Sequence, residues 1–270
     1  CSHFVPPSTF EASRQGTGPL KHTNTSQTFT DFSNCSLQIK FDIPSTVRAM
    51  AKFNIKVFSD NVCPWCFVGK RNLESAMKQF TEKQQPQSPP AFDVRWKPFF
   101  LNVESPETSD VRIVEYLNMK YGNRAGTRMA ASLEQAGQAT GISFNNERKV
   151  HNTIRSHRLV RLADGQNKGS EMIEQLFHGY FEEGKNICDS DVLLELAQKA
   201  GVECTKEYLQ GGEGEKEVMS EFQSGVRKHG ISGVPYFVVS REGSEASVPL
   251  SGGQPPEAFL EVFDRLSTSP

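Results

Sequence analysis

The chain has 270 residues, of which 36% are hydrophobic and 23% are charged, enough to bury a sizeable core in a globular protein. The formal net charge of -2 gives no electrostatic reason to expect nucleic acid or an anionic membrane surface as a partner. No apolar run approaches the length of a transmembrane span. The composition therefore favours a globular protein whose partners are neither nucleic acid nor membrane.

Residues 1–49 differ in composition from the rest, being rich in Ser, Thr, Asn and Pro with no sustained period. We expect this segment to be a disordered or spurious extension, and Met50 to be the natural start. A transit peptide is the rival interpretation, because acidic residues are few, but the segment has only four Lys/Arg and no secretory apolar core. The expected location is therefore cytoplasmic, with mitochondria as the less favoured alternative.

The first α/β pattern covers residues 50–105. Residues 53–59 form an apolar stretch that predicts a buried strand, and residues 67–80 have the apolar spacing of a helix. Residues 92–101 are rich in aromatic and β-branched side chains and predict a second strand, with Pro98 marking its end.

A long helical pattern follows, over residues 106–229. Ser109 and Asp110 are placed to cap its first helix, and glycines stand where several helices are expected to end. The Gly-Gly-Glu-Gly run at 211–214 is interpreted as a break, because no strand precedes it as a phosphate loop requires. The predicted helices are 110–121, 124–140, 152–163, 171–181, 189–200 and 216–229.

Strand character returns in residues 230–270. Residues 234–239 and 248–250 predict two strands joined by a polar turn, and residues 255–266 predict a terminal helix. The order of elements is strand, helix, strand, helical block, hairpin and helix, which predicts an α/β layer divided by an all-helical insertion.

The motif Cys63-Pro64-Trp65-Cys66 stands at the junction of the first strand and the first helix. Cys63 is expected at the helix N-terminus, where free N–H groups and the helix dipole favour a thiolate. The thiolate is the nucleophile of disulfide exchange, and Cys66, one turn along, is placed to resolve a mixed disulfide. Trp65 offers an apolar face to a substrate beside the sulfur.

The other cysteines are scattered, which is more typical of a reducing compartment than of a disulfide scaffold. Cys188 and Cys204 are interpreted as small inert side chains, and a second redox pair between them is not favoured. For Cys63 and Cys66 there are two alternatives to a redox role, a structural disulfide and half of a zinc site. Zinc requires about four ligands at suitable spacing, and no second Cys-x-x-Cys or clear His pair follows, so no metal is expected.

Three charged residues flank the motif. Asp60 either tunes the Cys66 proton or serves as a turn residue. Lys70 and Arg71 add positive charge nearby, and we expect their long side chains to point into water.

A second motif, Gly233-Val234-Pro235, precedes the late strand. A cis Val-Pro bond would turn the Val234 backbone toward the dithiol and leave its N–H and C=O free to pair with a substrate. Only about 5–6% of X–Pro bonds are cis, but the upstream Cys-x-x-Cys raises that expectation. Val234 and Pro235 are therefore predicted to bind substrate.

Further motifs follow one another in a specific order: Ser59-Asp60-Asn61-Val62, Trp96-Lys97-Pro98-Phe99, Asn152-Thr153, His157-Arg158-Leu159, Tyr180-Phe181 and Ser251-Gly252-Gly253-Gln254. With them the chain resembles the DsbA-like thioredoxin-fold oxidoreductases, specifically the FrnE-like branch, over about residues 53–266. The resemblance implies a thioredoxin fold in two parts, 50–105 and 230–270, separated by a large all-helical insertion, 106–229. It also implies that the cysteine pair is the redox centre and that Pro235 is cis.

The kappa-class glutathione transferases and 2-hydroxychromene-2-carboxylate isomerases belong to the same superfamily and resemble this chain in fold. They typically carry Ser at the position of Cys63 and lack the resolving cysteine, so the two thiols here favour dithiol exchange. Bacterial periplasmic DsbA has His at the position of Trp65. Because Trp65 cannot stabilise the thiolate in the same way, we expect a less oxidising couple.

Asn152 and His157 are candidate substrate-binding residues on the face of the insertion that covers the dithiol. The alternative for His157 is an ordinary hydrogen-bonded or surface histidine. Surface or helix-cap roles are expected for His151, His178 and His229.

Three functions follow as hypotheses. The leading one is a protein-disulfide oxidoreductase of the cytosol, acting on a disulfide-containing protein or a small-molecule thiol. The second is a glutathione-dependent isomerase or transferase acting on a small aromatic molecule, which is suggested by the relatives and by the aromatic residues Trp65, Phe67, Phe99 and Phe100. The third is a non-enzymatic interaction module that keeps the fold. No bound cofactor is expected, glutathione is a candidate co-substrate, and the sequence does not indicate an oligomeric state.

Overall fold

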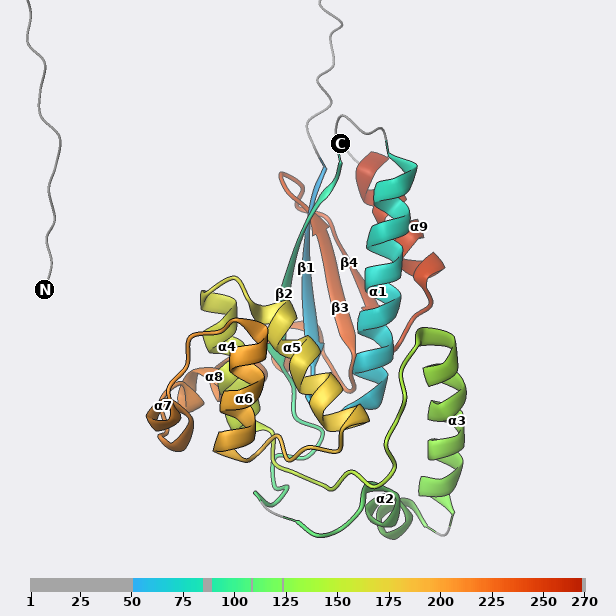
Figure 1. Cartoon of the computed structure of the whole chain (residues 1–270). Coiled ribbons are helices and arrows are strands. Elements are labelled where there is room, and N and C mark those ends of the chain that lie inside the picture. The colour runs from blue at the N-terminus through green and yellow to red at the C-terminus, as the bar shows by residue number, and fades with distance from the viewer. Residues whose placement is uncertain (1–50, 85–88, 108, 123, 269–270) are drawn as a thin grey trace, which may run out of the picture. The chain divides into compact units, whose positions relative to one another are not determined.

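A computed structural model of the chain describes residues 51–84, 89–107, 109–122 and 124–268 (Figure 1). These residues belong to one unit, Thr46–Pro270. The expected extension 1–49 and the expected start at Met50 lie outside the described residues, so both stay predictions.

Four strands form one mixed sheet in the order β2-β1-β3-β4. The strand β1 (Lys52–Ser59) pairs in parallel with β2 (Ala91–Pro98) and antiparallel with β3 (Tyr236–Arg241), which pairs antiparallel with β4 (Ser247–Ser251). Parallel neighbours require a crossover connection, and helix α1 (Pro64–Lys83) supplies it. The predicted strand-helix-strand unit and the late hairpin are therefore both present.

Helices α1 and α9 (Pro256–Thr268) lie side by side against one face of the sheet (Figure 1). Alternate side chains of β1 point to that face. Phe53 packs between the two helices, with its ring centroid 5.6 Å from that of Phe80 on α1 and 5.1 Å from that of Phe263 on α9. Phe237 of β3 extends the same layer toward α9. This apolar layer fixes α1, and with it the motif at its N-terminus, relative to the strands.

Helix α8 (Glu215–His229) packs against the opposite face of the sheet. Phe58 of β1 points to this side, where it forms a small buried cluster with Phe99 and Ile231. Gly225 of α8 allows the helix to come close, since a Cβ on Gly225 would lie 2.3 Å from the Phe58 ring.

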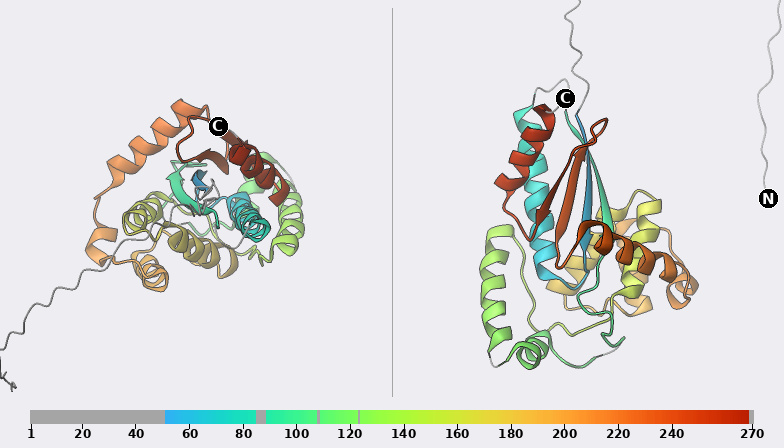
Figure 2. Two further views of the ribbon diagram at one scale, coloured as in Figure 1. Left: turned by 90° about the horizontal axis from the view of Figure 1, so that it is seen from above. Right: turned by 180° about the vertical axis from the view of Figure 1, so that it is seen from behind.

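The chain between β2 and β3 is helical, and Figure 2 shows its helices around both sides of the sheet. Its elements before α8 are α2 (Ile113–Tyr121), α3 (Ala125–Thr140), α4 (Ile154–Gly165), α5 (Gly169–Phe177), a π-helix (His178–Glu182), α6 (Ser190–Ala200) and α7 (Lys206–Gln210). Helix α3 contacts α1 and α2, whereas α4, α5 and α8 contact β2. The edge strand β2 is therefore covered, which protects its unpaired backbone groups.

One local expectation for the insertion is wrong, and one short helix was not predicted. Helix α2 begins at Ile113, with Arg112 as its N-cap, so Ser109 and Asp110 do not cap it. The Asp110 carboxylate instead pairs with Lys149, 2.6 Å away. The five-residue helix α7 was not predicted, because so short a segment shows no apolar period.

Candidate redox site at the N-terminus of helix α1

Cys63 is the N-cap residue of α1, and Pro64 is its first helical residue. The turn between β1 and α1 is closed by a hydrogen bond of 3.0 Å from the Cys63 N–H to the carbonyl oxygen of Asp60. The Cys66 N–H donates to the Cys63 carbonyl oxygen at the same distance, 3.0 Å. The N–H groups of the first helical turn and the positive end of the helix dipole therefore lie beside Cys63.

Cys66 lies one turn into the helix and is 1% exposed. Burial raises the pKa of its thiol well above the usual value, and the neighbouring Cys63 sulfur raises it further. The Ser59 side chain and the Asp60 backbone lower the pKa of Cys66, but by less. Both cysteines are free thiols in this structure. The pair thus combines one sulfur at the helix end with a second, protonated sulfur buried behind it.

Val234 brings the late part of the chain against the dithiol. The Cys63 Sγ lies 3.6 Å from the Val234 carbonyl oxygen, although the two residues are 171 positions apart. The Val234-Pro235 peptide bond is cis, as the resemblance implied. Pro235 packs on α1 at Gly69, where a Cβ would lie 3.0 Å from the proline ring. The two sequence motifs therefore meet at one point.

Cys63 lines a cavity of about 280 Å³. Trp65, which is 38% exposed, and Val234 form its wall beside the sulfur. Helices α2 and α3 and the loop after β2 contribute further lining side chains, most of which are apolar or aromatic, among them Leu101, Ile113, Tyr116, Leu117, Tyr121 and Leu133. An apolar cavity that reaches a thiol suits a small organic molecule or one side chain of a bound peptide.

Arg148, His151 and Tyr180, to which the sequence analysis gave no role at the site, also line this cavity. His151 is only 5% exposed, so the expected surface or cap role is wrong. It lies in an irregular segment without a period from which burial can be predicted. Burial lowers the pKa of His151, and Lys149 adds to this effect. Burial raises the pKa of Tyr180 to about 12, so its hydroxyl stays protonated, and it donates to the Lys149 carbonyl oxygen.

Asn152 is not among the residues that line the cavity. Its side-chain amide donates to the carbonyl oxygens of Val103 and Ser105, at 3.3 and 2.9 Å. Its Oδ1 accepts the Ile154 N–H at 2.8 Å. Asn152 therefore ties the loop after β2 to the start of α4.

His157 is likewise absent from the cavity wall and lies behind it, 4% exposed. Its Nε2 is 3.1 Å from the Phe99 carbonyl oxygen and 3.5 Å from Asp60 Oδ1. The other carboxylate oxygen of Asp60 accepts the Leu101 N–H at 2.7 Å. Asp60 and His157 thus hold the loop after β2 in place, while the Asp60 carbonyl closes the turn before Cys63.

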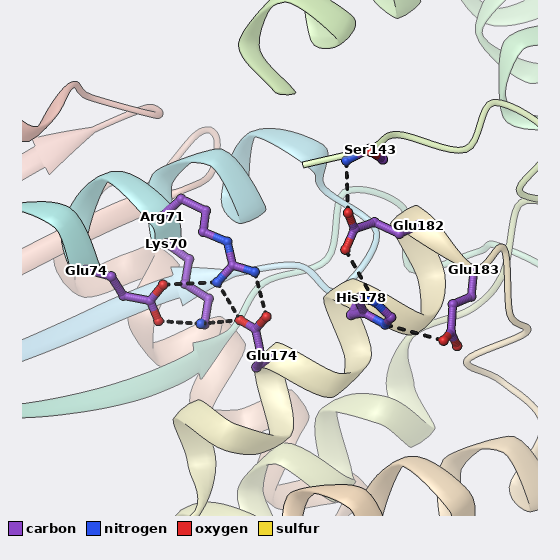
Figure 3. A network of polar contacts seen from close by, with 8 residues as sticks. All are labelled: Lys70, Arg71, Glu74, Ser143, Glu174, His178, Glu182 and Glu183. Atoms are coloured by element: carbon purple, nitrogen blue, oxygen red, sulfur yellow. Dashed lines mark hydrogen bonds and ion pairs between the residues drawn. The ribbon is translucent and has the colours of Figure 1, made fainter. Parts of the chain in front are cut away.

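An ion-pair network joins α1 to the insertion (Figure 3). Lys70 Nζ lies 2.5 Å from Glu74 on its own helix and 2.5 Å from Glu174 on α5, and Arg71 Nη2 lies 2.6 Å from Glu174. The Lys70 side chain is only 4% exposed and that of Arg71 only 28%, so the expectation that both point into water is wrong. The reason is Glu174, a partner 104 positions away that local sequence does not reveal.

A second group of ion pairs lies in the π-helix that follows α5 (Figure 3). His178 is half-exposed and lies 3.6 Å from Glu182 and 3.5 Å from Glu183. Glu182 also accepts the Ser143 N–H at 2.9 Å, which ties the segment after α3 to the π-helix. The exposure of His178 agrees with the surface role expected for it.

The remaining described cysteines are Cys188, which is buried, and Cys204, which is partly exposed; both are free thiols. Burial raises the pKa of each, against the nearby charges of Arg155 and Arg158 respectively. Within the described ranges, no group of three or more His, Cys, Asp or Glu side chains is arranged to hold a metal ion. In the same part of the chain, no helix has the length and apolar character needed to cross a membrane.

Comparison with known proteins identifies one curated relative, the uncharacterized protein YwbO of Bacillus subtilis (strain 168), at 27% identity over 222 residues, covering 78% of this chain and 94% of YwbO. The structure is similar to that of the probable DsbA oxidoreductase SCO1869 from Streptomyces coelicolor, with a TM-score of 0.69 at 24% identity, covering 81% of this chain and 91% of that one. At such identity, structural similarity shows the fold alone.

Two further solved structures share the fold. The cytosolic disulfide reductase DsbM from Pseudomonas aeruginosa, solved with GSH, has a TM-score of 0.54 at 21% identity, covering 79% of this chain and 100% of that chain. A 2-hydroxychromene-2-carboxylate isomerase has a TM-score of 0.54 at 11% identity, covering 79% of this chain and 95% of that chain. The predicted thioredoxin fold with a helical insertion is confirmed. The family model of the DSBA-like thioredoxin domain matches residues 54–264, so the chain belongs to the DSBA-like thioredoxin domain family.

Proposed function

We propose that the chain is a thiol-disulfide oxidoreductase whose redox centre is the Cys63–Cys66 pair. The observation that carries this proposal is the arrangement of the two thiols: Cys63 is the N-cap of α1 and lines a cavity, and Cys66 is buried one turn beyond it. A nucleophile at a helix N-terminus with a resolving thiol behind it is the layout that disulfide exchange requires.

The reaction proceeds in two exchanges. The Cys63 thiolate attacks one sulfur of a substrate disulfide, forms a mixed disulfide and releases the other half as a thiolate. Cys66 then gives up its proton and attacks the Cys63 sulfur, which closes the Cys63–Cys66 disulfide and releases the second thiolate. The substrate gains the two electrons that the cysteine pair loses, and the reverse sequence oxidises a dithiol substrate.

Other residues orient the substrate. Trp65 and Val234 line the cavity next to the sulfur, and the Val234 carbonyl oxygen, 3.6 Å from Cys63 Sγ, is an acceptor for a substrate N–H. Trp65, Val234 and Pro235 therefore stay our candidates for substrate binding. Asn152 and His157 act indirectly, through the loop after β2 that they hold.

The substrate is a disulfide-containing protein or a small thiol compound, and the compartment we propose is the cytoplasm. The cysteine usage supports a reducing compartment, and one solved structure with this fold is named a cytosolic disulfide reductase.

Reduction of insulin disulfides, with dithiothreitol or glutathione as electron donor, tests the proposal. Cys63→Ser should abolish the activity, because Cys63 is the one thiol among the described residues that line the cavity. Cys66→Ala should keep the first exchange and accumulate a mixed disulfide that non-reducing mass spectrometry detects. Cys204→Ser removes a thiol outside the cavity and should behave as the unaltered chain. Full insulin reduction by Cys63→Ser would overturn the assignment.

A second candidate is a glutathione-dependent isomerase or transferase. The aromatic wall of the cavity, with Trp65, Tyr116 and Tyr121, favours a small aromatic substrate, and the fold is shared with an isomerase of this kind and with a reductase solved with GSH. Such a reaction needs only one thiol. Glutathione-dependent turnover of an aromatic substrate that survives in Cys66→Ala would favour this candidate over dithiol exchange.

A further inference from the structure

Arg148 carries a buried positive charge without a carboxylate partner. The residue is 2% exposed, and none of the described Asp or Glu side chains lies within ion-pair distance of it. Its Nη1 donates to the carbonyl oxygen of Asn145 at 2.6 Å, but its Nε is buried and has no hydrogen-bond partner. Two described cations of comparable depth are better satisfied: Arg158 donates to three carbonyl oxygens and Lys70 has two carboxylates.

Burying a guanidinium without a carboxylate partner is energetically unfavourable. An arginine stays protonated in proteins, and charged groups are rarely buried unless they are paired. The ring centroids of Phe144, Tyr180 and Phe181 lie 5.9, 6.0 and 5.3 Å from the guanidinium carbon, so cation–π attraction offsets part of the cost. Burial nevertheless lowers the pKa of Arg148, against the opposing influence of Tyr180.

The unsatisfied guanidinium belongs to the cavity that Cys63 lines. His151, on the same wall, also has a buried nitrogen, Nδ1, without a partner. Lys120 lines the cavity as well. Among the described lining residues the one carboxylate is that of Asp60, whose Oδ2 accepts the Leu101 N–H and whose Oδ1 lies 3.5 Å from His157 Nε2 without a hydrogen-bond partner. The cavity lining therefore offers positive charge and an unused donor, the Arg148 Nε–H.

We propose that Arg148 is the recognition site for a carboxylate on the substrate, and that the preferred substrates are small disulfides with an apolar or aromatic body and at least one carboxylate. This inference rests on the proposed function for the reaction itself, but not for the binding of the anion. A planar guanidinium binds a carboxylate through two parallel hydrogen bonds, which orients the molecule as well as attracting it. The apolar side chains that line the same cavity take the body of the molecule.

Dithiobis(nitrobenzoate), a dianionic aromatic disulfide, is a direct probe of this geometry. The Cys63 thiolate attacks one of its sulfurs, forming the mixed disulfide and releasing one coloured thionitrobenzoate. The Cys66 thiol then loses its proton and displaces the second thionitrobenzoate as the Cys63–Cys66 disulfide closes. Dithiodipyridine, which is uncharged at neutral pH, undergoes the same exchanges without a carboxylate.

We expect Arg148→Met to slow the reaction of dithiobis(nitrobenzoate) by about 10-fold or more, as the loss of a charged hydrogen bond does, and to leave the rate with dithiodipyridine nearly unchanged. Arg148→Lys keeps the charge but not the planar fork. Its rate with dithiobis(nitrobenzoate) should lie between the rates of the unaltered chain and of Arg148→Met. Arg227→Met removes the same charge from the exposed last turn of α8 and should change neither rate. The proposal would be overturned if Arg148→Met slowed the reaction of both probes equally, or slowed neither.

Anion binding is tested separately in Cys63→Ser, which lacks the proposed nucleophile. Benzoate should raise the melting temperature of Cys63→Ser and benzamide should not, because a ligand that binds only the folded chain stabilises it. The benzoate shift should vanish in the double variant with Arg148→Met. If Cys63→Ser keeps insulin-reducing activity while the benzoate shift persists, the proposed function fails and the anion site stands; if the shift is absent, the anion site fails.

Discussion

Lys70 on α1 and Glu174 on α5 form an ion pair with 2.5 Å between Nζ and Oε2 (Figure 3). Lys70 follows Cys66 by one helical turn, and its side chain is 4% exposed. A buried ammonium needs a partner, since an unpaired charge in a poorly polarisable environment is costly. The helix that carries the dithiol is therefore coupled electrostatically to the helical insertion.

We predict that Glu174→Gln lowers the stability of the chain by about 1–2 kcal/mol at neutral pH, a value below that for a fully buried pair because Glu174 is partly exposed. Burial alone would raise the pKa of Glu174, but Arg71 and Lys70 hold it below the usual value. A lowered folded-state pKa stabilises the fold above the unfolded pKa of about 4.3, and this contribution is lost as the pH falls through the folded value. Urea denaturation should therefore find that Glu174→Gln and the unaltered chain converge in stability only when the pH falls below the lowered folded-state pKa of Glu174.

Glu82→Gln is the matched control for this prediction. Glu82 also lies on α1 and faces a lysine, Lys78, but at 4.0 Å and with both side chains largely exposed. Such exposed pairs contribute little to stability. The denaturation midpoint of Glu82→Gln should therefore equal that of the unaltered chain at both acid and neutral pH. Equal effects of the two substitutions would refute a special role for Glu174.

The described thiols should differ in reactivity. Burial raises the pKa of Cys66, Cys188 and Cys204, whereas Cys63 lies at a helix N-terminus and lines a cavity. Alkylation requires the thiolate. We expect iodoacetamide at neutral pH to label Cys63 first, and peptide mass spectrometry to find the other three unlabelled at that time. Earlier labelling of Cys188 or Cys204 would contradict this order.

The parts of the fold that local pattern determines could be predicted from the sequence. The apolar strand before Cys63 and the helix after it follow from residue spacing, as does the helix predicted from residue 189, where the Asp189 carboxylate caps α6 by accepting the N–H groups of Asp191 and Val192. Gly201 ends that helix in the left-handed conformation, which glycine adopts without steric cost.

The parts of the structure that depend on contacts between residues far apart in the chain could not be predicted from the sequence. Lys70 has the sequence environment of a surface residue, and only Glu174 on α5 makes its burial tolerable. Arg148 and His151 belong to an irregular segment with no period, so nothing local places them on the cavity that Cys63 lines. The nucleophile of the candidate site was therefore predictable from its motif, whereas the wall that faces it was not.

Ser59 should affect the second exchange rather than the first. Its side chain lowers the pKa of the buried Cys66 thiol, against the larger effect of burial. Ser59→Ala should therefore raise the pKa of Cys66 further and lengthen the lifetime of the mixed disulfide, while the alkylation rate of Cys63 stays the same. Stopped-flow measurement of the two phases with an aromatic disulfide separates these steps. Thr81→Ala removes an exposed hydroxyl at the far end of α1 and serves as the control; slowing of the first phase by Ser59→Ala would contradict the assignment.

Gly225 sets the distance between α8 and the sheet. A Cβ at this position would lie 2.3 Å from the ring of Phe58, which is 4% exposed and held in a small buried cluster. We predict that Gly225→Ala destabilises the chain by about 1–3 kcal/mol, because overpacking outweighs the gain in helix propensity. Gly165 lies in the last turn of α4, where an added Cβ would have no packing neighbour within 4 Å, so Gly165→Ala should be neutral or slightly stabilising. Urea denaturation of both variants checks the comparison, and equal midpoints would mean that the Phe58 ring moves aside without cost.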